Sequence, residues 1–154
     1  MSTTLSSDEI ESLAVARLAP RLRNNVITYD GDYVMISDAS CGQFMADLAE
    51  ETVKVLGSWR SEYRDCDKFA RLLQALAIAD HADSWIADGR TPNGGLAIGT
   101  LSYVQDSGGN HAINLIYTKV IGKSQINLRT YEPQTGEELF LSPSEKASCF
   151  KLVI

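Results

Sequence analysis

A cysteine, a histidine and a carboxylate in this sequence have the types and spacing that fit thiol chemistry. Cys66 stands in the stretch YRDCDKFARLL, at the expected first turn of a helix. Unpaired N–H groups and the helix dipole favour an anion there, which lowers the pKa of a thiol, and the thiolate is the nucleophile. His111 is the candidate base, and Glu132 or Gln134 is the candidate that fixes its tautomer by accepting a hydrogen bond. The pattern predicts a nucleophilic cysteine site made of these four residues.

A helix over residues 66–80 is expected to place Cys66 at its first turn. Asp65 is a good N-cap residue. An apolar stripe with i, i+3, i+4 and i+7 spacing follows, which is typical of a helix packed on a core. The stripe consists of Phe69, Leu72, Leu73, Leu76 and Ala77. Two acids, Asp65 and Asp67, flank the thiol and oppose its ionisation, so a thiolate there needs the histidine as its ion-pair partner.

Two predicted strands, residues 111–120 and 125–131, are expected to bring the histidine and its partner together. Alternation places His111 on the same face as Ile113 and Leu115, which are predicted core residues. The turn between the strands is short, which is typical of antiparallel pairing.

The partner of the histidine depends on the register of these two strands. A turn centred on the glycine and lysine of the segment IGKS sets Gln134 opposite His111 and Glu132 opposite Ile113. Pro133 has no N–H and interrupts the ladder, so regular pairing is expected to stop before Gln134. We therefore predict that Glu132 orients His111.

The rest of the chain predicts an α+β fold in which N-terminal helices and the Cys66 helix pack on an antiparallel β-meander. The segment SSDE, Ser6–Glu9, is a capping box that opens a helix, and a second helix is expected to begin near Ser37 or Asp38. The other expected segments are strands at 26–29, 33–36 and 96–105, a loop at 89–95, an edge strand at 149–154, and a helix end or strand at 52–59. We expect one domain over residues 1–154.

The remaining cysteines and histidine are predicted to be structural. Cys41 and Cys149 have no base in the pattern, and His81 lies at the expected end of its helix, where a cation complements the dipole. Three cysteines and two histidines give neither a disulfide framework nor a zinc site. We expect no metal and no cofactor.

The charge and hydropathy of the chain limit its partners and location. A net charge of -6 argues against general nucleic-acid binding and against docking on anionic membranes. No apolar run approaches the roughly 20 residues of a membrane span, and the N-terminus lacks the features of a secretory signal. We expect a cytoplasmic protein, with secretion by a signal-independent route left open.

The segments DCDKFA (Asp65–Ala70), NHAIN (Asn110–Asn114) and YEPQTGE (Tyr131–Glu137), in this order, resemble the bacterial transglutaminase-like and papain-like cysteine enzymes. The resemblance covers about residues 63–138, roughly half of the chain. The portion HAIN…EPQTG is also similar to papain-fold glutamine deamidase domains. Members of the superfamily place a cysteine at a helix start, and a histidine and an acid or amide on successive antiparallel strands. Most transglutaminase-like members have Asp where this sequence has Glu132.

The resemblance implies a papain- or transglutaminase-like core and a cysteine-dependent amidohydrolase or acyltransferase. That activity would be of the peptidase, glutamine deamidase or transglutaminase-like type, on a protein or peptide substrate. Cys66 would attack the carbonyl, His111 would carry the proton and Glu132 would orient His111. The backbone N–H of Cys66 and the side chain of Gln43 are candidate oxyanion donors. The alternative is a non-catalytic binding or inhibitor protein of phage or bacterial origin on the same fold. The reactivity of the Cys66 thiol distinguishes the two.

Overall fold

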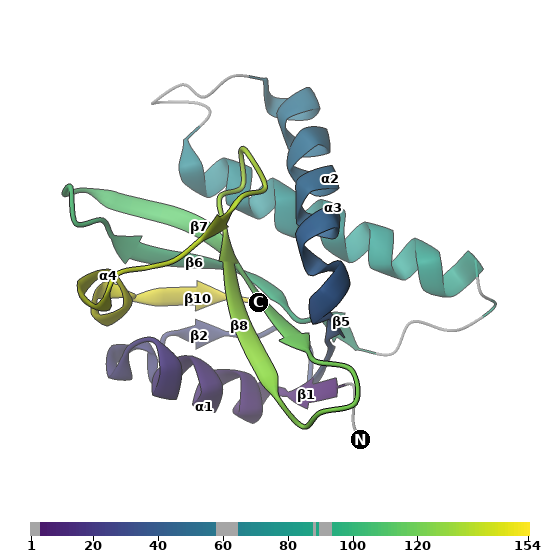
Figure 1. The fold of residues 1–154 in the computed structure, drawn as a ribbon, viewed down its shortest axis with the longest axis horizontal. Helices are drawn as coiled ribbons and strands as arrows, with labels where there is room; N and C mark the ends of the chain where they lie inside the picture. The colour runs from purple at the N-terminus through teal and green to yellow at the C-terminus, as the bar shows by residue number, and fades with distance from the viewer. Residues whose placement is uncertain (1–3, 58–64, 88, 90–93) are drawn as a thin grey trace.

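The computed structural model describes residues 4–57, 65–87, 89 and 94–154. Within these residues the chain forms two β-sheets, four α-helices and one short 3-10 helix, η1 (Figure 1). In chain order the elements are β1 (Thr4–Ser6), α1 (Ser7–Arg17), η1 (Pro20–Leu22), β2 (Val26–Ile27), β3 (Asp32–Val34), β4 (Ile36–Ser37), α2 (Asp38–Leu56), α3 (Cys66–Ala87), β5 (Gly95–Leu96), β6 (Ile98–Val104), β7 (Asn110–Lys119), β8 (Ile126–Tyr131), β9 (Glu138–Leu139), α4 (Pro143–Ser148) and β10 (Lys151–Val153). None of the helices in these ranges has both the length and the apolar character needed to cross a bilayer.

The larger sheet has the strand order β2-β10-β6-β7-β8-β9, and β4 pairs with one part of β7. Strands β6, β7 and β8 pair antiparallel with their sequence neighbours. The pairs β2–β10 and β4–β7 are parallel. The smaller sheet has the order β1-β3-β5, with β1 antiparallel and β5 parallel to β3.

The predicted fold class is therefore wrong. The expected meander of β6, β7 and β8 is present, but it is the middle of a larger mixed sheet, and a second sheet accompanies it. Strand β10 lies inside the sheet, between β2 and β6, and not at the predicted edge. The missed strands are two or three residues long, too short for an alternating pattern in the sequence, and several pair with distant segments.

Local boundaries differ from the expected ones in three places. Helix α3 continues to Ala87, so His81 lies inside the helix and not at its end. The predicted strand at 96–105 is divided at Ala97 into β5 and β6. The ambiguous segment 52–59 is helical as far as Leu56, and its last residues lie outside the described ranges. Residues 90–93 of the predicted loop also lie outside them.

The register of β7 and β8 agrees with the sequence prediction. Asn114 lies opposite Tyr131 and Thr118 lies opposite Asn127, which is the pairing that a turn centred on the IGKS segment requires. Strand β8 ends at Tyr131, just before Glu132 and two residues before the proline that was expected to interrupt the ladder. Glu132 therefore directly follows a strand whose register against β7 is set by the turn, and this register determines the direction of its side chain.

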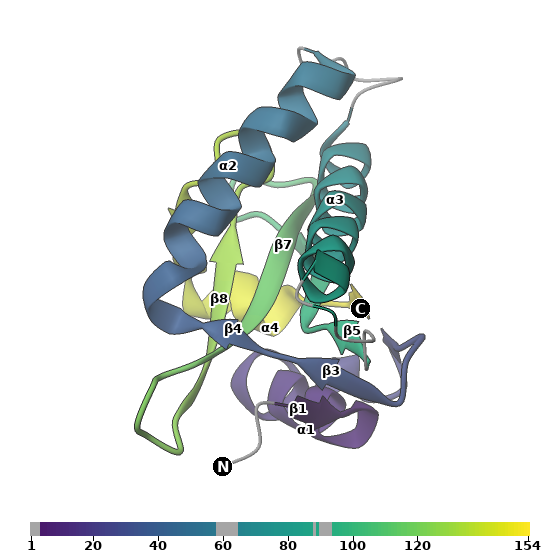
Figure 2. The same ribbon diagram turned by 90° about the vertical axis from the view of Figure 1, so that its right-hand side faces the viewer.

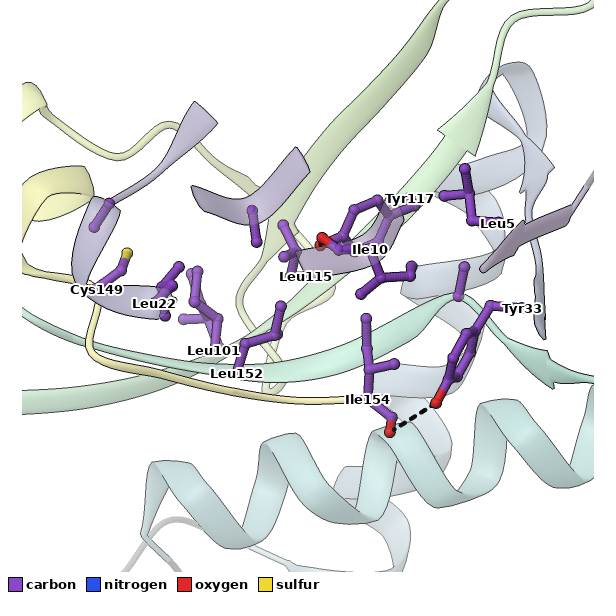
Figure 3. Close-up of a cluster of buried hydrophobic side chains, with 14 of the residues drawn as sticks. Leu5, Ile10, Leu22, Tyr33, Leu101, Leu115, Tyr117, Cys149, Leu152 and Ile154 are labelled. Carbon is purple, nitrogen blue, oxygen red and sulfur yellow. Dashed lines mark hydrogen bonds between the residues drawn. The ribbon is translucent and has the colours of Figure 1, made fainter. Parts of the chain in front are cut away.

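Helices cover both faces of the larger sheet. On β7, Leu115 and Tyr117 face the core cluster that includes Ile10 of α1, whereas Ile116 faces the cluster formed with α2 and α3. Figure 2 shows α2 and α3 over β7 and β8, with α1 apart from both. Figure 3 shows the α1-side cluster, to which the C-terminal Leu152 also belongs. Full burial of each such side chain stabilises the fold by about 1.5–3 kcal/mol.

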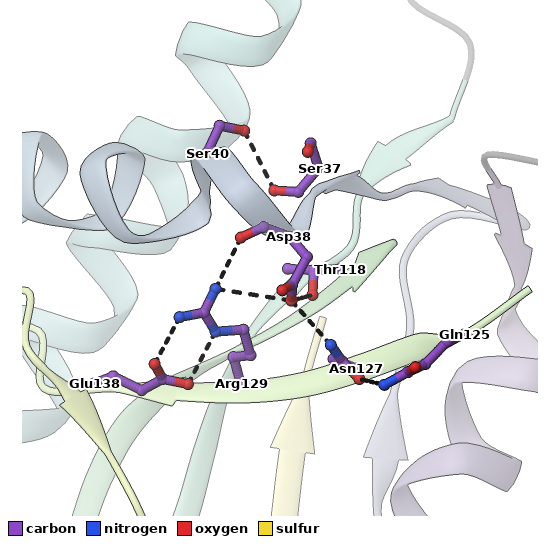
Figure 4. Close-up of polar contacts among 8 residues, drawn as sticks. All are labelled: Ser37, Asp38, Ser40, Thr118, Gln125, Asn127, Arg129 and Glu138. Carbon is purple, nitrogen blue, oxygen red and sulfur yellow. Dashed lines mark hydrogen bonds and ion pairs between the residues drawn. The ribbon is translucent and has the colours of Figure 1, made fainter. Parts of the chain in front are cut away.

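A polar cluster fixes the start of α2 against three strands (Figure 4). Arg129 of β8 donates two hydrogen bonds to the carboxylate of Glu138 on β9, at 2.9 and 2.6 Å, and a third to the Asp38 carbonyl at 2.9 Å. The Asp38 carboxylate accepts from Thr118 at 2.6 Å and from Asn127 at 3.1 Å, and these bonds lower its pKa. The cluster thus holds α2 on the sheet at the predicted helix start.

The predicted capping box at the start of α1 is present. The Ser6 hydroxyl accepts from the Glu9 backbone N–H at 3.3 Å, and the Glu9 carboxylate accepts from the Ser6 backbone N–H at 2.8 Å. We expect Ser6→Ala to lower the free energy of unfolding by about 1 kcal/mol. Ser6→Gly should lower it by only a few tenths of a kcal/mol, because glycine is a tolerated N-cap. Urea denaturation of the two variants measures the difference. Equal losses would show that the side-chain bond contributes little.

Candidate functional site

Cys66 is the first residue of α3. The Asp65 carbonyl accepts from the backbone N–H groups of Lys68 and Phe69, at 3.2 and 3.3 Å, and the Asp65 carboxylate also accepts from the Lys68 backbone. Asp65 is therefore the N-cap, as the sequence predicted. The half-buried thiol lies in the first turn, where the helix dipole favours its anion.

His111 and Glu132 meet at the ends of β7 and β8. The imidazole Nε2 lies 3.0 Å from Glu132 Oε2, and the two side chains are 15% and 20% exposed. The backbone N–H of Gln134 donates to Glu132 Oε1 at 3.5 Å. Glu132 thus contacts the histidine, and Gln134 supports the carboxylate through its main chain.

The Cys66 thiol lies beside the His111 side chain and Ala112 on the wall of one cleft, and it interacts with both. The interaction with His111 lowers the pKa of Cys66, against an opposing effect of burial. The interaction with the thiol, followed by the bond to Glu132, raises the pKa of His111 to about 9. Because Nε2 faces Glu132, the other ring nitrogen is left for the thiol. Between these two pKa values the pair is a thiolate and an imidazolium.

The two acids beside the thiol are hydrogen-bonded to each other. This bond lowers the pKa of Asp65 and raises the pKa of Asp67. The raised pKa of Asp67 favours its neutral form, which reduces the negative charge beside Cys66. Asp65 and Asp67 therefore oppose ionisation of the Cys66 thiol less strongly than two fully charged carboxylates would.

A cleft of about 360 Å³ opens over this site. Its walls combine the thiol and imidazole with carboxylates, neutral polar groups and apolar groups. The residues that line it are Asp65, Cys66, Asp67, Ser102, Asn110, His111, Ala112 and Phe150. Among the residues that the structure describes, no lysine or arginine lines the cleft. The arrangement can hold a small ligand with one of its carbon atoms next to the thiolate.

The other residues singled out in the sequence lie away from this cleft. Cys41 and Cys149 are fully buried, and burial raises the pKa of both thiols, that of Cys149 to about 11. Gln43 lies on α2 and donates to Asp47 at 2.7 Å, and it does not line the cleft, so the prediction of an oxyanion donor at Gln43 is wrong. In the described ranges, no group of three or more His, Cys, Asp or Glu side chains is arranged to hold a metal ion.

Sequence reasoning missed Tyr103 and Phe150. Tyr103 lies directly opposite His111 in the β6–β7 ladder. Centring the pairing on the predicted turn DSGGN would set Ile113 opposite Tyr103, so that turn alone did not indicate the observed pair. Phe150 lines the cleft from the segment between α4 and β10, and no local pattern indicates that position.

The fold is similar to about half of a solved lectin chain. Polyporus squamosus lectin, as PSL1a in complex with E64, matches 99% of this chain with a TM-score of 0.67 and 22% identity. The same lectin bound to the human-type influenza-binding epitope Neu5Acα2-6Galβ1-4GlcNAc matches 99% with a TM-score of 0.67 and 23% identity. The chain spans about half of these structures, 52% and 50% of their lengths. No family model and no curated protein matches the sequence.

These matches correct the resemblance drawn from the sequence. The structures that share the fold are lectin chains, so the assignment to transglutaminase-like and papain-like cysteine enzymes is wrong. The predicted amidohydrolase or acyltransferase activity rested on that assignment and is wrong with it. The order of a cysteine, a histidine and an acid recurs on unrelated folds, so motif order alone could not identify the family.

Proposed function

We propose that this protein binds a ligand in the cleft over Cys66, and that the Cys66 thiolate bonds to ligands carrying a thiol-reactive carbon. The observation that carries the proposal is that Cys66 and His111 line one open cleft, with Glu132 Oε2 3.0 Å from the imidazole Nε2. In this function Cys66 is the nucleophile, and the imidazolium of His111 stabilises its anion. The thiolate forms a C–S bond while the bond from that carbon to its leaving group, such as an epoxide oxygen, breaks. The leaving group takes the electron pair, and the imidazolium of His111 can give it a proton. Glu132 orients the imidazole, and the backbone of Gln134 supports Glu132.

Two further observations support a binding role. The lowered pKa of Cys66 and the raised pKa of His111 both favour the thiolate–imidazolium pair. The two solved structures named above are complexes, one with E64 and one with a glycan epitope. Because this chain corresponds to half of that lectin, each ligand is a candidate here and is tested separately.

The thiol proposal is tested by competition for Cys66. The native protein is treated with iodoacetamide at pH 6.5, with and without E64, and the modified cysteines are identified by mass spectrometry. We expect Cys66 to be alkylated first and E64 to slow its alkylation. Cys41 and Cys149 should react only after unfolding, because both are buried and have raised pKa values.

A matched control replaces the nucleophile alone. Cys66→Ser should remove the fast alkylation and leave the slow reaction of the two buried thiols unchanged. Equal or faster alkylation of Cys41 or Cys149 in the native protein would contradict the proposal. Fast alkylation of Cys66 that E64 does not affect would exclude E64 as a ligand of this cleft.

Glycan binding is the second candidate, and the lectin complex with Neu5Acα2-6Galβ1-4GlcNAc favours it. A glycan then takes the place of the expected protein or peptide substrate. Isothermal titration calorimetry with this trisaccharide, and with Galβ1-4GlcNAc as the control without sialic acid, tests the candidate. Binding heat with the trisaccharide and none with Galβ1-4GlcNAc would support sialylated glycans as ligands. No heat from either sugar would exclude this epitope as a ligand of the chain.

A further inference from the structure

Tyr103 of β6 stands directly opposite His111 of β7. Their rings are arranged edge to face, with centroids 5.7 Å apart and an angle of 72° between the planes. Tyr103 is only 3% exposed and belongs to the core cluster that includes Leu101 and Ile113. A close-packed side chain of this kind cannot swing away without opening the core. The imidazole is therefore bordered by two groups, the Glu132 carboxylate at one nitrogen and the Tyr103 ring beside it.

We propose that Tyr103 is a positioning residue of the Cys66 site. Its ring keeps the His111 imidazole in the orientation that serves both Glu132 and the Cys66 thiol. This inference rests on the proposed function of Cys66 as a reactive thiolate. The second side-chain torsion of histidine is broad and roughly two-fold, so the backbone alone does not fix the ring plane. Glu132 holds one nitrogen but leaves rotation about that contact open, and the Tyr103 ring blocks this rotation.

The contact acts through shape and not through charge. Burial raises the pKa of Tyr103 to about 12, so its phenol stays neutral while Cys66 and His111 titrate. The part of Tyr103 that faces the imidazole is its ring, in an edge-to-face arrangement. Asp65 opposes ionisation of the thiol by its charge, but that effect is common to the wild type and to any Tyr103 variant. A change at Tyr103 thus reports on the orientation of His111.

The test follows the rate of Cys66 alkylation by iodoacetamide from pH 5.5 to 9.5. Tyr103→Leu removes the ring, Tyr103→Phe keeps it, and Leu101→Ala loosens the same core cluster on the same strand without touching His111. We expect Tyr103→Leu to raise the pH midpoint and to lower the rate at pH 6 by about two- to tenfold, the size of one edge-to-face contact. Tyr103→Phe should restore the wild-type midpoint, and Leu101→Ala should not shift it. Circular dichroism checks the folding of each variant, and Tyr103→Met, whose longer and more flexible side chain adapts to irregular gaps, replaces Tyr103→Leu if that variant does not fold.

The outcomes separate this inference from the function on which it rests. A wild-type midpoint near 8.5, that of an ordinary thiol, would contradict the reactive thiolate itself. A low wild-type midpoint that Tyr103→Leu leaves unchanged would overturn only the positioning role. A shift in Leu101→Ala as large as that in Tyr103→Leu would assign the effect to the loosened core and would overturn the positioning role as well.

Discussion

Replacing His111 with alanine is expected to move the pH midpoint of Cys66 alkylation up towards about 8.5, the value of an unperturbed thiol. The interaction with His111 is the largest of the effects that lower the pKa of Cys66. At pH 6 only about 0.3% of an unperturbed thiol is ionised. A thiolate of higher pKa is intrinsically more nucleophilic, which offsets part of this loss. We therefore expect the rate at pH 6 to fall by at least about tenfold, measured with iodoacetamide and mass spectrometry.

The upper end of the pH profile gives an independent check on the same pair. His111 has a pKa raised to about 9, so its imidazolium persists up to that pH and is lost above it. The wild-type profile should show a second inflection near pH 9, where the thiolate loses its cationic partner, and His111→Ala should lack it. His81→Ala removes the other histidine in the sequence and should leave both features in place. A His111→Ala variant with the wild-type midpoint would mean that the helix start alone ionises Cys66.

Gly136→Ala is expected to be strongly destabilising, by about 2–5 kcal/mol. Gly136 has φ +70°, a left-handed conformation that costs an L side chain about 1–2 kcal/mol. A Cβ there would also lie 2.6 Å from Ala46 Cα and 2.9 Å from the Met45 carbonyl oxygen on α2. Relieving this overlap requires the helix or the turn to shift, which costs about 1–3 kcal/mol more. Urea denaturation gives the free energy of unfolding.

Gly108→Ala is the matched control for this substitution. Gly108 has φ +90°, but an added Cβ would have no heavy atom within 4 Å, so only the backbone strain applies. We expect a loss of about 1–2 kcal/mol at Gly108. Equal losses at the two glycines would contradict close packing of the turn on α2. The turn matters for the site because Gly136 donates its backbone N–H to the Glu132 carbonyl at 2.8 Å. Displacing it should therefore also slow Cys66 alkylation at pH 6.

The local geometry of the candidate site was predictable because each part of it depends on short-range rules. Asp65 caps α3 as its residue type suggests, which places Cys66 in the first turn. The turn between β7 and β8 fixed the register, and the strand end before Pro133 fixed the direction of Glu132. These rules predicted Glu132, and not Gln134, as the partner of His111, and the structure has that contact.

The fold class was not predictable in the same way because it depends on pairing between distant short segments. β2 is two residues long and pairs with β10, from the other end of the chain. β5 is also two residues long and joins a separate sheet with β3 and β1. No periodicity develops over two residues, so these partners leave no sequence pattern. The motifs around Cys66, His111 and Glu132 then suggested an enzyme family that the whole fold does not support.

The internal position of β10 has a consequence for how the chain folds. Leu152 lies between Val26 of β2 and Leu101 of β6, so one short strand joins segments from the two ends and the middle of the sequence. Bringing such distant segments together costs loop-closure entropy before any contact compensates for it, which is typical of slowly folding topologies. Until β10 docks, the open edge of β6 can pair with another chain. Refolding at high protein concentration therefore favours aggregation through this edge over the native sheet.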